Sequence, residues 1–201
     1  MRRIFVMIAA VFILAVGAVA QEGRSEISLQ GTGFFTKDSS GQGNTQRATA
    51  TGGFLVGYRY HFNRWLAAEA AYGYNRNSQH FFAPGGFSRV QANAHQATGG
   101  FVVNLPVPAR FRFSPYVLAA GGALVFDPTE NAFDSIAGAQ KQAAGVFVYG
   151  GGADFPVVKH ISLRAEYRGL VYNAPDFGLR SVGSDATTHT AQPSAGIVFR
   201  F

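Results

Sequence analysis

The sequence contains no cysteine among its 201 residues. The absence of thiols excludes a disulfide scaffold, a cysteine-ligated zinc site, an iron–sulfur cluster and thiol catalysis. Charged residues are scarce as well, at 14% of the chain, and the 17 basic and 11 acidic side chains leave a formal charge of +6. Lysine and arginine form no cluster anywhere, so this dispersed surplus predicts no nucleic-acid partner.

Long hydrophobic runs are absent except at the amino terminus. A basic start at Arg2 and Arg3 precedes an uninterrupted apolar run over 4–20, whose last three residues read Ala-Val-Ala. This order is typical of a cleaved secretory signal peptide. We therefore predict a signal peptide over 1–20 and a mature domain over 21–201. A single anchoring helix is the alternative, because the run reaches the lower length limit of about 17 residues for a membrane span.

Apolar residues are plentiful but finely dispersed along the rest of the chain. Hydrophobic residues make up 47% and aromatic residues 14% of the sequence, which is more than a disordered chain carries. The mean hydropathy is nevertheless only +0.07. The remaining apolar runs are interrupted by glycines, each of which disfavours a helix by about 1 kcal/mol. These observations predict an all-β domain.

Alternation of apolar and polar residues predicts β-strands along much of the chain. Residues 54–62 and 66–75 both alternate, and the Asn63-Arg64 pair between them predicts a hairpin. Long and short connections follow one another, which would gather long loops at one end of the sheet and short turns at the other. The predicted strands are 24–36, 47–62, 65–75, 90–105, 114–126, 142–155, 160–172 and 189–201.

Alternation alone does not say which face of the sheet points inward. In a soluble sandwich or barrel the apolar face lines the core, whereas in a membrane barrel it faces lipid and the polar face lines the lumen. Small residues on the polar face, aromatic residues near the strand ends and the sorted connections favour the membrane barrel. The small residues are Gly57, Ala67, Ala71, Gly73, Ala119, Gly121 and Ala123. The aromatic residues predicted at the membrane interfaces are Tyr58, Tyr60, Phe62, Trp65, Tyr72, Tyr74, Tyr167 and Tyr172.

We therefore predict an all-β fold, an eight-stranded antiparallel up-and-down transmembrane β-barrel. Each unpaired backbone group costs several kcal/mol in lipid, so strand 189–201 must pair with strand 24–36 to close the sheet. Unpaired charge in a low-dielectric interior is also costly, so the inward charges should pair across the lumen. Arg59 and Glu69 are expected to face each other in the hairpin. The predicted luminal network comprises Arg59, Glu69, Arg164, Glu166, Arg168 and Arg200.

The pattern resembles the small outer-membrane β-barrel proteins of Gram-negative bacteria, the family that includes the barrel domain of outer membrane protein A and small surface-adhesion barrels. The resemblance rests on the signal peptide, the hairpin 57–69, the strands 115–119 and 163–168, and the ending 194–201. It implies an outer-membrane location, contact with lipid and lipopolysaccharide, and a carboxyl-terminal signal that the barrel-assembly machinery reads. That signal comprises Ala195, Ile197, Phe199 and Phe201, and Pro193 interrupts its pattern one step upstream.

The expected function is a structural or adhesion-like surface role, because an eight-stranded lumen is only wide enough to be filled by side chains. A gated small-solute pore is the alternative for the lumen. The predicted loop 76–89 carries the surface candidates His80, Phe81, Phe82 and Phe87, since exposed aromatic residues favour contact with a partner. Alternatively, these phenylalanines rest on the barrel rim or in lipopolysaccharide.

Catalytic, cofactor-binding and metal-binding residues are not expected. His160 and Ser162 resemble the His-x-Ser of lipid A deacylases, which leaves a lipid-modifying enzyme as an alternative, but Glu166 is only a weak candidate for a third catalytic group. The histidines are scattered without the spacing of metal ligands. We therefore predict a monomer that is not an enzyme. A soluble, lipocalin-like ligand-binding barrel is the competing class.

Overall fold

The structure is a computed structural model that covers the predicted mature domain in most of its length. It describes the backbone of residues 23–36, 39–41, 44–48, 51–83, 86–108, 110–128, 141–173 and 187–201, and the side chains of 23–36, 51–75, 93–108, 110–127, 141–173 and 187–201. The predicted signal peptide lies outside these residues. No helix in the described part of the chain is long and apolar enough to cross a membrane.

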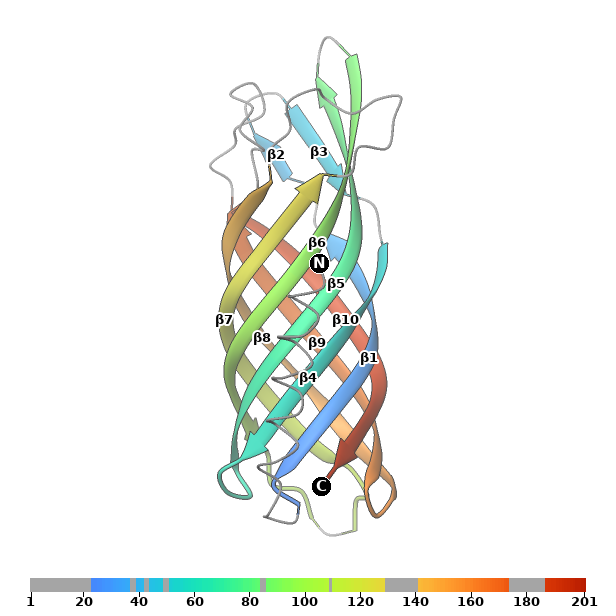
Figure 1. Ribbon diagram of the computed structural model, residues 1–201, viewed down its shortest axis with the longest axis vertical. Helices are drawn as coiled ribbons and strands as arrows, with labels where there is room; N and C mark the ends of the chain where they lie inside the picture. The colour runs from blue at the N-terminus through green and yellow to red at the C-terminus, as the bar shows by residue number, and fades with distance from the viewer. Residues whose placement is uncertain are drawn as a thin grey trace, which may run out of the picture.

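Eight long strands form a closed antiparallel barrel (Figure 1). They are β1 (Ser25–Thr36), β4 (Thr51–His61), β5 (Leu66–Ala83), β6 (Gly86–Asn104), β7 (Ser114–Pro128), β8 (Gln142–Val158), β9 (Ile161–Asn173) and β10 (Thr187–Arg200). Each pairs with the next, and β1 closes the sheet by pairing with β10 from Glu26↔Arg200 to Thr36↔Thr190. The predicted fold and its closure are therefore confirmed. Closure leaves the wall without a free edge, as a backbone in lipid requires.

Two short strands lie outside this barrel wall. β2 (Ser39–Gly41) pairs with β3 (Asn44–Ala48), and β3 pairs in turn with the far part of β5, from Thr45↔Phe82 to Ala48↔Gln79. The predicted strand 47–62 is therefore too long, because its wall portion begins at Thr51.

The prediction of a loop over 76–89 is wrong, because β5 and β6 continue through this segment as a paired hairpin. β4 pairs with β5 only as far as Asn75, and β7 pairs with β6 only from Ala92 onward. Beyond these points β5 and β6 pair with each other up to Ala83↔Gly86, and they extend past the rim of the barrel (Figure 1). The segment carries no apolar–polar alternation, so periodicity gives no sign of it.

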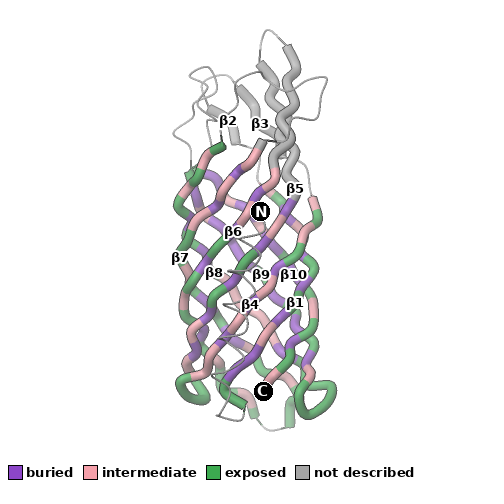
Figure 2. The backbone as a smooth tube through the Cα atoms, in the orientation of Figure 1, coloured by how far each residue is buried: buried purple, intermediate pink, exposed green. Residues whose placement is uncertain are grey.

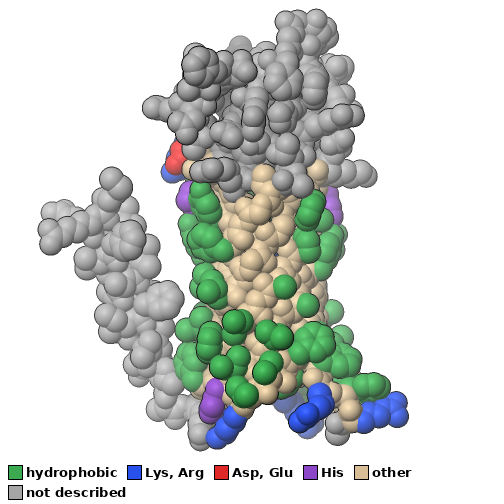
Figure 3. Space-filling view, turned by 90° about the vertical axis from the view of Figure 1, so that its right-hand side faces the viewer, with side chains coloured by type: hydrophobic (Ala, Val, Ile, Leu, Met, Phe, Trp, Pro, Cys, Tyr) green, Lys and Arg blue, Asp and Glu red, His purple; other side chains and the backbone are tan. Residues whose placement is uncertain are grey.

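Burial alternates along the wall, as the colouring of Figure 2 makes visible. In β9, for example, Arg164 and Glu166 are buried while Leu163 and Tyr167 are exposed. On the face that Figure 3 shows, hydrophobic side chains lie along both flanks of the wall and across its lower part. The charged face points inward and the apolar face outward, which is the orientation expected of a barrel in lipid.

Strand β7 departs from the predicted assignment of faces. Ala119 and Gly121 are exposed, and Tyr116, Leu118 and Leu124 are buried in the lumen. The prediction that Ala119, Gly121 and Ala123 line the lumen is therefore wrong. Both faces of β7 are apolar, so alternation cannot distinguish them.

The turn between β4 and β5 fixes the register of the hairpin that carries the predicted Arg59–Glu69 pair. The Oδ1 atom of Asn63 accepts hydrogen bonds from the backbone amides of Trp65 and Leu66, at 2.8 and 2.9 Å. Such a side-chain turn is a common role of asparagine between strands. It sets Arg59 opposite Glu69.

Candidate functional site: the luminal charge network

The network begins with the predicted pair in the first long hairpin. Arg59 on β4 donates to one oxygen of Glu69 on β5, with Nη2–Oε2 and Nε–Oε2 distances of 2.6 and 3.0 Å. The other oxygen of Glu69 accepts from Arg168 Nη2 at 2.7 Å. Glu69 thus bridges two arginines from opposite parts of the sequence, and the expectation that it faces Arg59 is confirmed.

Strand β9 supplies three charges to the lumen at every second position. Arg168 Nε donates to Glu166 Oε1 at 2.6 Å, and Glu166 Oε2 lies 3.6 Å from Arg59 Nη2. Because side chains two apart on a strand share a face, Arg164, Glu166 and Arg168 form an inward column. The structure brings all three into the network with Arg59 and Glu69.

Two carboxylates that complete the network were missed by the sequence prediction. Asp154 on β8 accepts two hydrogen bonds from Arg164, at 2.7 and 2.8 Å, in a bidentate pair. Glu26 on β1 accepts from Arg164 Nη2 at 2.6 Å and lies 3.3 Å from Arg59 Nη1. The only sequence signal was that both are charged residues within predicted strands, because the register that sets them opposite network arginines, Glu26↔Arg200 and Asp154↔Arg164, comes from the structure.

Tyr116 on β7 is the aromatic centre of the network and was also missed. Its hydroxyl donates to Glu166 Oε2 at 2.5 Å. The guanidinium carbons of Arg59 and Arg164 lie 4.3 and 5.2 Å from the centre of its ring. Contacts of this kind between a cation and an aromatic face are favourable, most of all where water is excluded. Tyr116 therefore links Arg59 on β4 with Arg164 and Glu166 on β9.

Arg200 lies at the edge of the network rather than inside it. Its Nη2 is 2.9 Å from Glu26 Oε2, but its side chain is 39% exposed. His61 Nε2 lies 3.2 Å from the same carboxylate oxygen. Arg200 and His61 thus face the end of the barrel that carries the short turns.

The charges of the network balance. Four arginines, Arg59, Arg164, Arg168 and Arg200, face four carboxylates, Glu26, Glu69, Asp154 and Glu166. Apart from Arg200, these side chains are at most 5% exposed. Removing one member would leave an uncompensated buried charge, which is strongly destabilising. The arrangement is therefore an internal plug of ion pairs.

The rest of the lumen is filled by uncharged side chains. Hydrogen bonds join Gln30 to Ser194 at 2.9 Å and Gln192 to Gln96 at 3.2 Å. Fully buried apolar residues lie among them: Phe34, Leu55, Leu124, Phe126 and Leu170. This packing is what an eight-stranded barrel is expected to enclose.

The predicted interface aromatics have two outcomes. Phe62, Trp65, Tyr72 and Tyr167 are exposed on the outer wall, and Tyr58, Tyr60 and Tyr74 are half-buried there. Tyr172 is a wrong prediction, because it is 3% exposed, and its hydroxyl lies 3.0 Å from Thr190 Oγ1 inside the barrel. Where both faces of a strand carry apolar residues, the fact that a residue is aromatic does not tell which face it lies on.

The remaining predicted residues lie as follows. Ala195, Ile197, Phe199 and Phe201 alternate with inward residues at the end of β10, and the ladder to β1 lacks a pair at Pro193 while its register is kept. His80, Phe81, Phe82 and Phe87 lie in the β5–β6 hairpin, and their side chains are outside the described residues.

His160 is exposed in the β8–β9 turn, whereas Ser162 faces the lumen. Among the described side chains, no three His, Asp or Glu residues gather as metal ligands would.

A closed antiparallel barrel with an apolar outer wall and a charged interior defines the class of outer-membrane β-barrels. Consistent with this, the family model of the outer membrane protein beta-barrel domain matches residues 6–201, and the chain belongs to that family. The protein is therefore an integral outer-membrane barrel rather than a soluble, lipocalin-like one.

Solved structures with the same fold include Neisserial surface protein A, at 14% identity and a TM-score of 0.61, with 88% of this chain and 97% of that chain covered. Outer membrane protein OprG from Pseudomonas aeruginosa is 12% identical, with a TM-score of 0.63 and coverage of 90% and 97%. No curated protein sequence matches the chain. At these identities the likeness concerns the fold alone.

Proposed function

We propose that the protein is a monomeric, non-conducting outer-membrane barrel that presents the β5–β6 hairpin for contact with another surface. The observation that carries this proposal is the extension of β5 and β6 beyond the wall, where they pair with each other from Ser78↔Gln91 to Ala83↔Gly86 and β5 also pairs with β3. Residues 1–20 would direct export, and the carboxyl-terminal signal would deliver the chain to the barrel-assembly machinery.

The orientation follows from the connections. Short turns on the periplasmic side and longer connections outside are typical of bacterial outer-membrane barrels. The β4–β5 and β8–β9 turns share one end of the barrel with Ser25 and Phe201, whose backbones are hydrogen-bonded to each other. Placing this end in the periplasm puts the β5–β6 hairpin on the outer side of the membrane.

The hairpin is suited to contact because it is paired and carries aromatic residues. Phe82 and Phe87 occupy one register position on opposite strands, and β3 pairs alongside at Thr45↔Phe82. Cross-strand aromatic pairs stabilise a hairpin, and aromatic residues outside a core favour a partner surface. A strand-paired element also loses little conformational entropy on binding.

Replacing residues 78–91 by Asn-Gly tests this proposal. The two-residue turn would close the hairpin at Asn77↔Ala92 and leave the wall pairs of β5 and β6 intact. We expect cells that display this variant to lose adhesion to cultured epithelial cells and to one another. A variant with 129–140 replaced by a Gly-Ser segment serves as the control, and heat-modifiable gel mobility checks folding. Unchanged adhesion at equal surface levels would remove the proposal.

The closed lumen has its own test, because the alternative of a small-solute pore depends on it. Buried ion pairs and apolar side chains in succession along the lumen support a barrel without a water path. We expect the purified, folded protein to give no conductance steps in a planar lipid bilayer. Reproducible steps that disappear on unfolding would refute the non-conducting role.

A further inference from the structure

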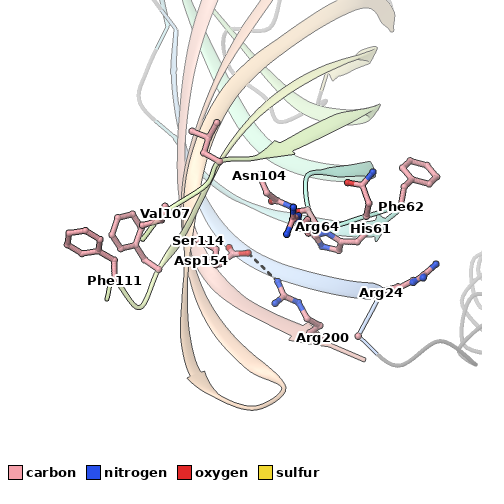
Figure 4. Close-up of a pocket in the computed structure, with 14 residues that line it drawn as sticks. Arg24, His61, Phe62, Arg64, Asn104, Val107, Phe111, Ser114, Asp154 and Arg200 are labelled. Atoms are coloured by element: carbon pink, nitrogen blue, oxygen red, sulfur yellow. Dashed lines mark hydrogen bonds and ion pairs between the residues drawn. The ribbon is translucent and has the colours of Figure 1, made fainter. Parts of the chain in front are cut away.

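A cavity of about 610 Å³ lies at the mouth of the barrel where the short turns meet, and its lining is cationic. Arg24, Arg64 and Arg200 line it together with His61 (Figure 4). Asp154 is the acidic side chain among the described lining residues, and both of its oxygens are already held by Arg164. Arg200 is paired with Glu26, so the uncompensated cations of the cavity are Arg24 and Arg64, and no carboxylate among the lining side chains is free to neutralise them.

The uncompensated charge of the described side chains is concentrated at this end. Inside, the four arginines and four carboxylates of the network cancel, and near the opposite end Asp127 is paired with Lys141 at 3.5 Å. The remaining cationic side chains form no ion pair with a carboxylate of the described residues, and the carboxylate at Phe201 offsets only one of them. They are Arg24, Arg64, Arg110, Arg112 and Lys159. Figure 3 shows Lys and Arg gathered below the hydrophobic wall.

An aromatic row connects the cavity to the lipid-facing wall. Phe111 and Phe113 line the cavity and contact each other edge to face, with ring centres 5.9 Å apart. Phe113 stacks in turn on Phe155, which is exposed on the outer face of β8, at 6.1 Å. A ligand with its anionic group in the cavity could lay an apolar chain along these rings. A free inorganic anion would make no use of them.

We propose that this mouth binds the phosphodiester headgroup of an anionic phospholipid, with the acyl chains lying over Phe113 and Phe155. Arg24 and Arg64 supply the charge that selects an anionic over a zwitterionic lipid. The assignment of the site to the inner leaflet rests on the orientation in the proposed function. Binding itself does not, because a vesicle offers the same lipid on both sides.

Trp65 is the only tryptophan of the chain and lies in the turn beside Arg64, so it reports on lipid at this mouth. The full protein is folded into phosphatidylcholine vesicles that contain a small, fixed fraction of brominated phosphatidylglycerol or brominated phosphatidylcholine. We expect the anionic quencher to reduce Trp65 fluorescence more strongly than the zwitterionic one. Arg24→Gln and Arg64→Gln should each lower that preference about fivefold. The guanidinium of Arg64 lies 4.9 Å from the centre of the Trp65 ring, so Arg64→Gln can change the fluorescence of Trp65 directly. The quenching of this variant by brominated phosphatidylglycerol is therefore divided by its quenching by brominated phosphatidylcholine.

Arg112→Gln and Lys159→Gln are the matched controls, since both residues lie at the same end but do not line the cavity. Both controls should retain the preference. Equal quenching by the two lipids, or an equal loss in the controls, would overturn the proposed cavity. If inorganic phosphate abolished the preference for brominated phosphatidylglycerol, the site would be assigned to a soluble anion and the proposal of a lipid ligand would be overturned. None of these outcomes bears on the adhesion assay, so the two proposals fail separately.

Discussion

Replacing Glu69 by glutamine should remove a large part of the stability of the barrel. Glu69 accepts three charge-assisted hydrogen bonds, two from Arg59 and one from Arg168, and its side chain is 5% exposed. Glutamine has nearly the same shape as glutamate, but its NH2 group would point a hydrogen-bond donor at the guanidinium of Arg59 or Arg168. Because glutamine is neutral, one positive charge of the lumen would also be left uncompensated. Losing one partner of a buried ion pair costs about 3–5 kcal/mol. That loss is a large share of the roughly 5–15 kcal/mol by which proteins are stable.

The assay is urea-induced unfolding in lipid vesicles, followed by Trp65 fluorescence and heat-modifiable gel mobility. Asp127→Asn is the matched control, because its partner Lys141 and Asp127 itself are 61% and 48% exposed, and such pairs contribute about 0–1 kcal/mol. The double variant Glu69→Gln with Arg168→Gln should recover part of the loss, with a coupling of about 1–3 kcal/mol. The reasoning is refuted if Glu69→Gln costs no more than Asp127→Asn, or if the two luminal substitutions add without coupling.

Three further changes probe the wall, the turn and assembly. Gly122→Ala should cost about 1–3 kcal/mol in the same unfolding assay, because a Cβ there would lie 2.7 Å from the backbone Cα of Thr98 on the neighbouring strand, whereas Gly145→Ala meets no atom within 4 Å and should be neutral. Asn63→Ala should lower the unfolding free energy by about 1–2 kcal/mol by leaving two turn amides without their acceptor, and an unchanged urea midpoint would contradict this. Phe201→Ala keeps the backbone bonds to β1 but should reduce the folded protein in outer-membrane fractions several-fold; equal yield would show that the terminal ring is not read during assembly.

The faces of most strands could be predicted because one face is charged or small and the other apolar. In β4, β5 and β9 the alternation identified Arg59, Glu69, Arg164, Glu166 and Arg168 as inward residues. A two-residue periodicity is a property of the strand itself, so it needs no knowledge of neighbouring strands. The hairpin pair could be predicted as well, since a short turn fixes the register of the strands that it joins.

Periodicity failed where both faces are alike or where alternation is missing. Tyr172 was assigned to the membrane interface and Ala119 to the lumen, and each lies on the opposite face. The β5–β6 extension was assigned to a loop, because its strands lack alternation. In these segments the pairing with neighbouring strands decides the structure.

The sequence by itself determined that these residues build a β-barrel, which side chains of the clearly alternating strands point inward, and that their charges must be paired. Beyond the hairpin pair of Arg59 and Glu69, only the tertiary structure decided which charges meet. Glu26 and Arg164 are 138 residues apart and lie 2.6 Å from each other, and the ring of Tyr116 on β7 contacts both Arg164 on β9 and Arg59 on β4. Alternation gives the face of a residue but not its height or its neighbours across the lumen. Those depend on the tilt and stagger of the closed barrel, which all eight strands set together.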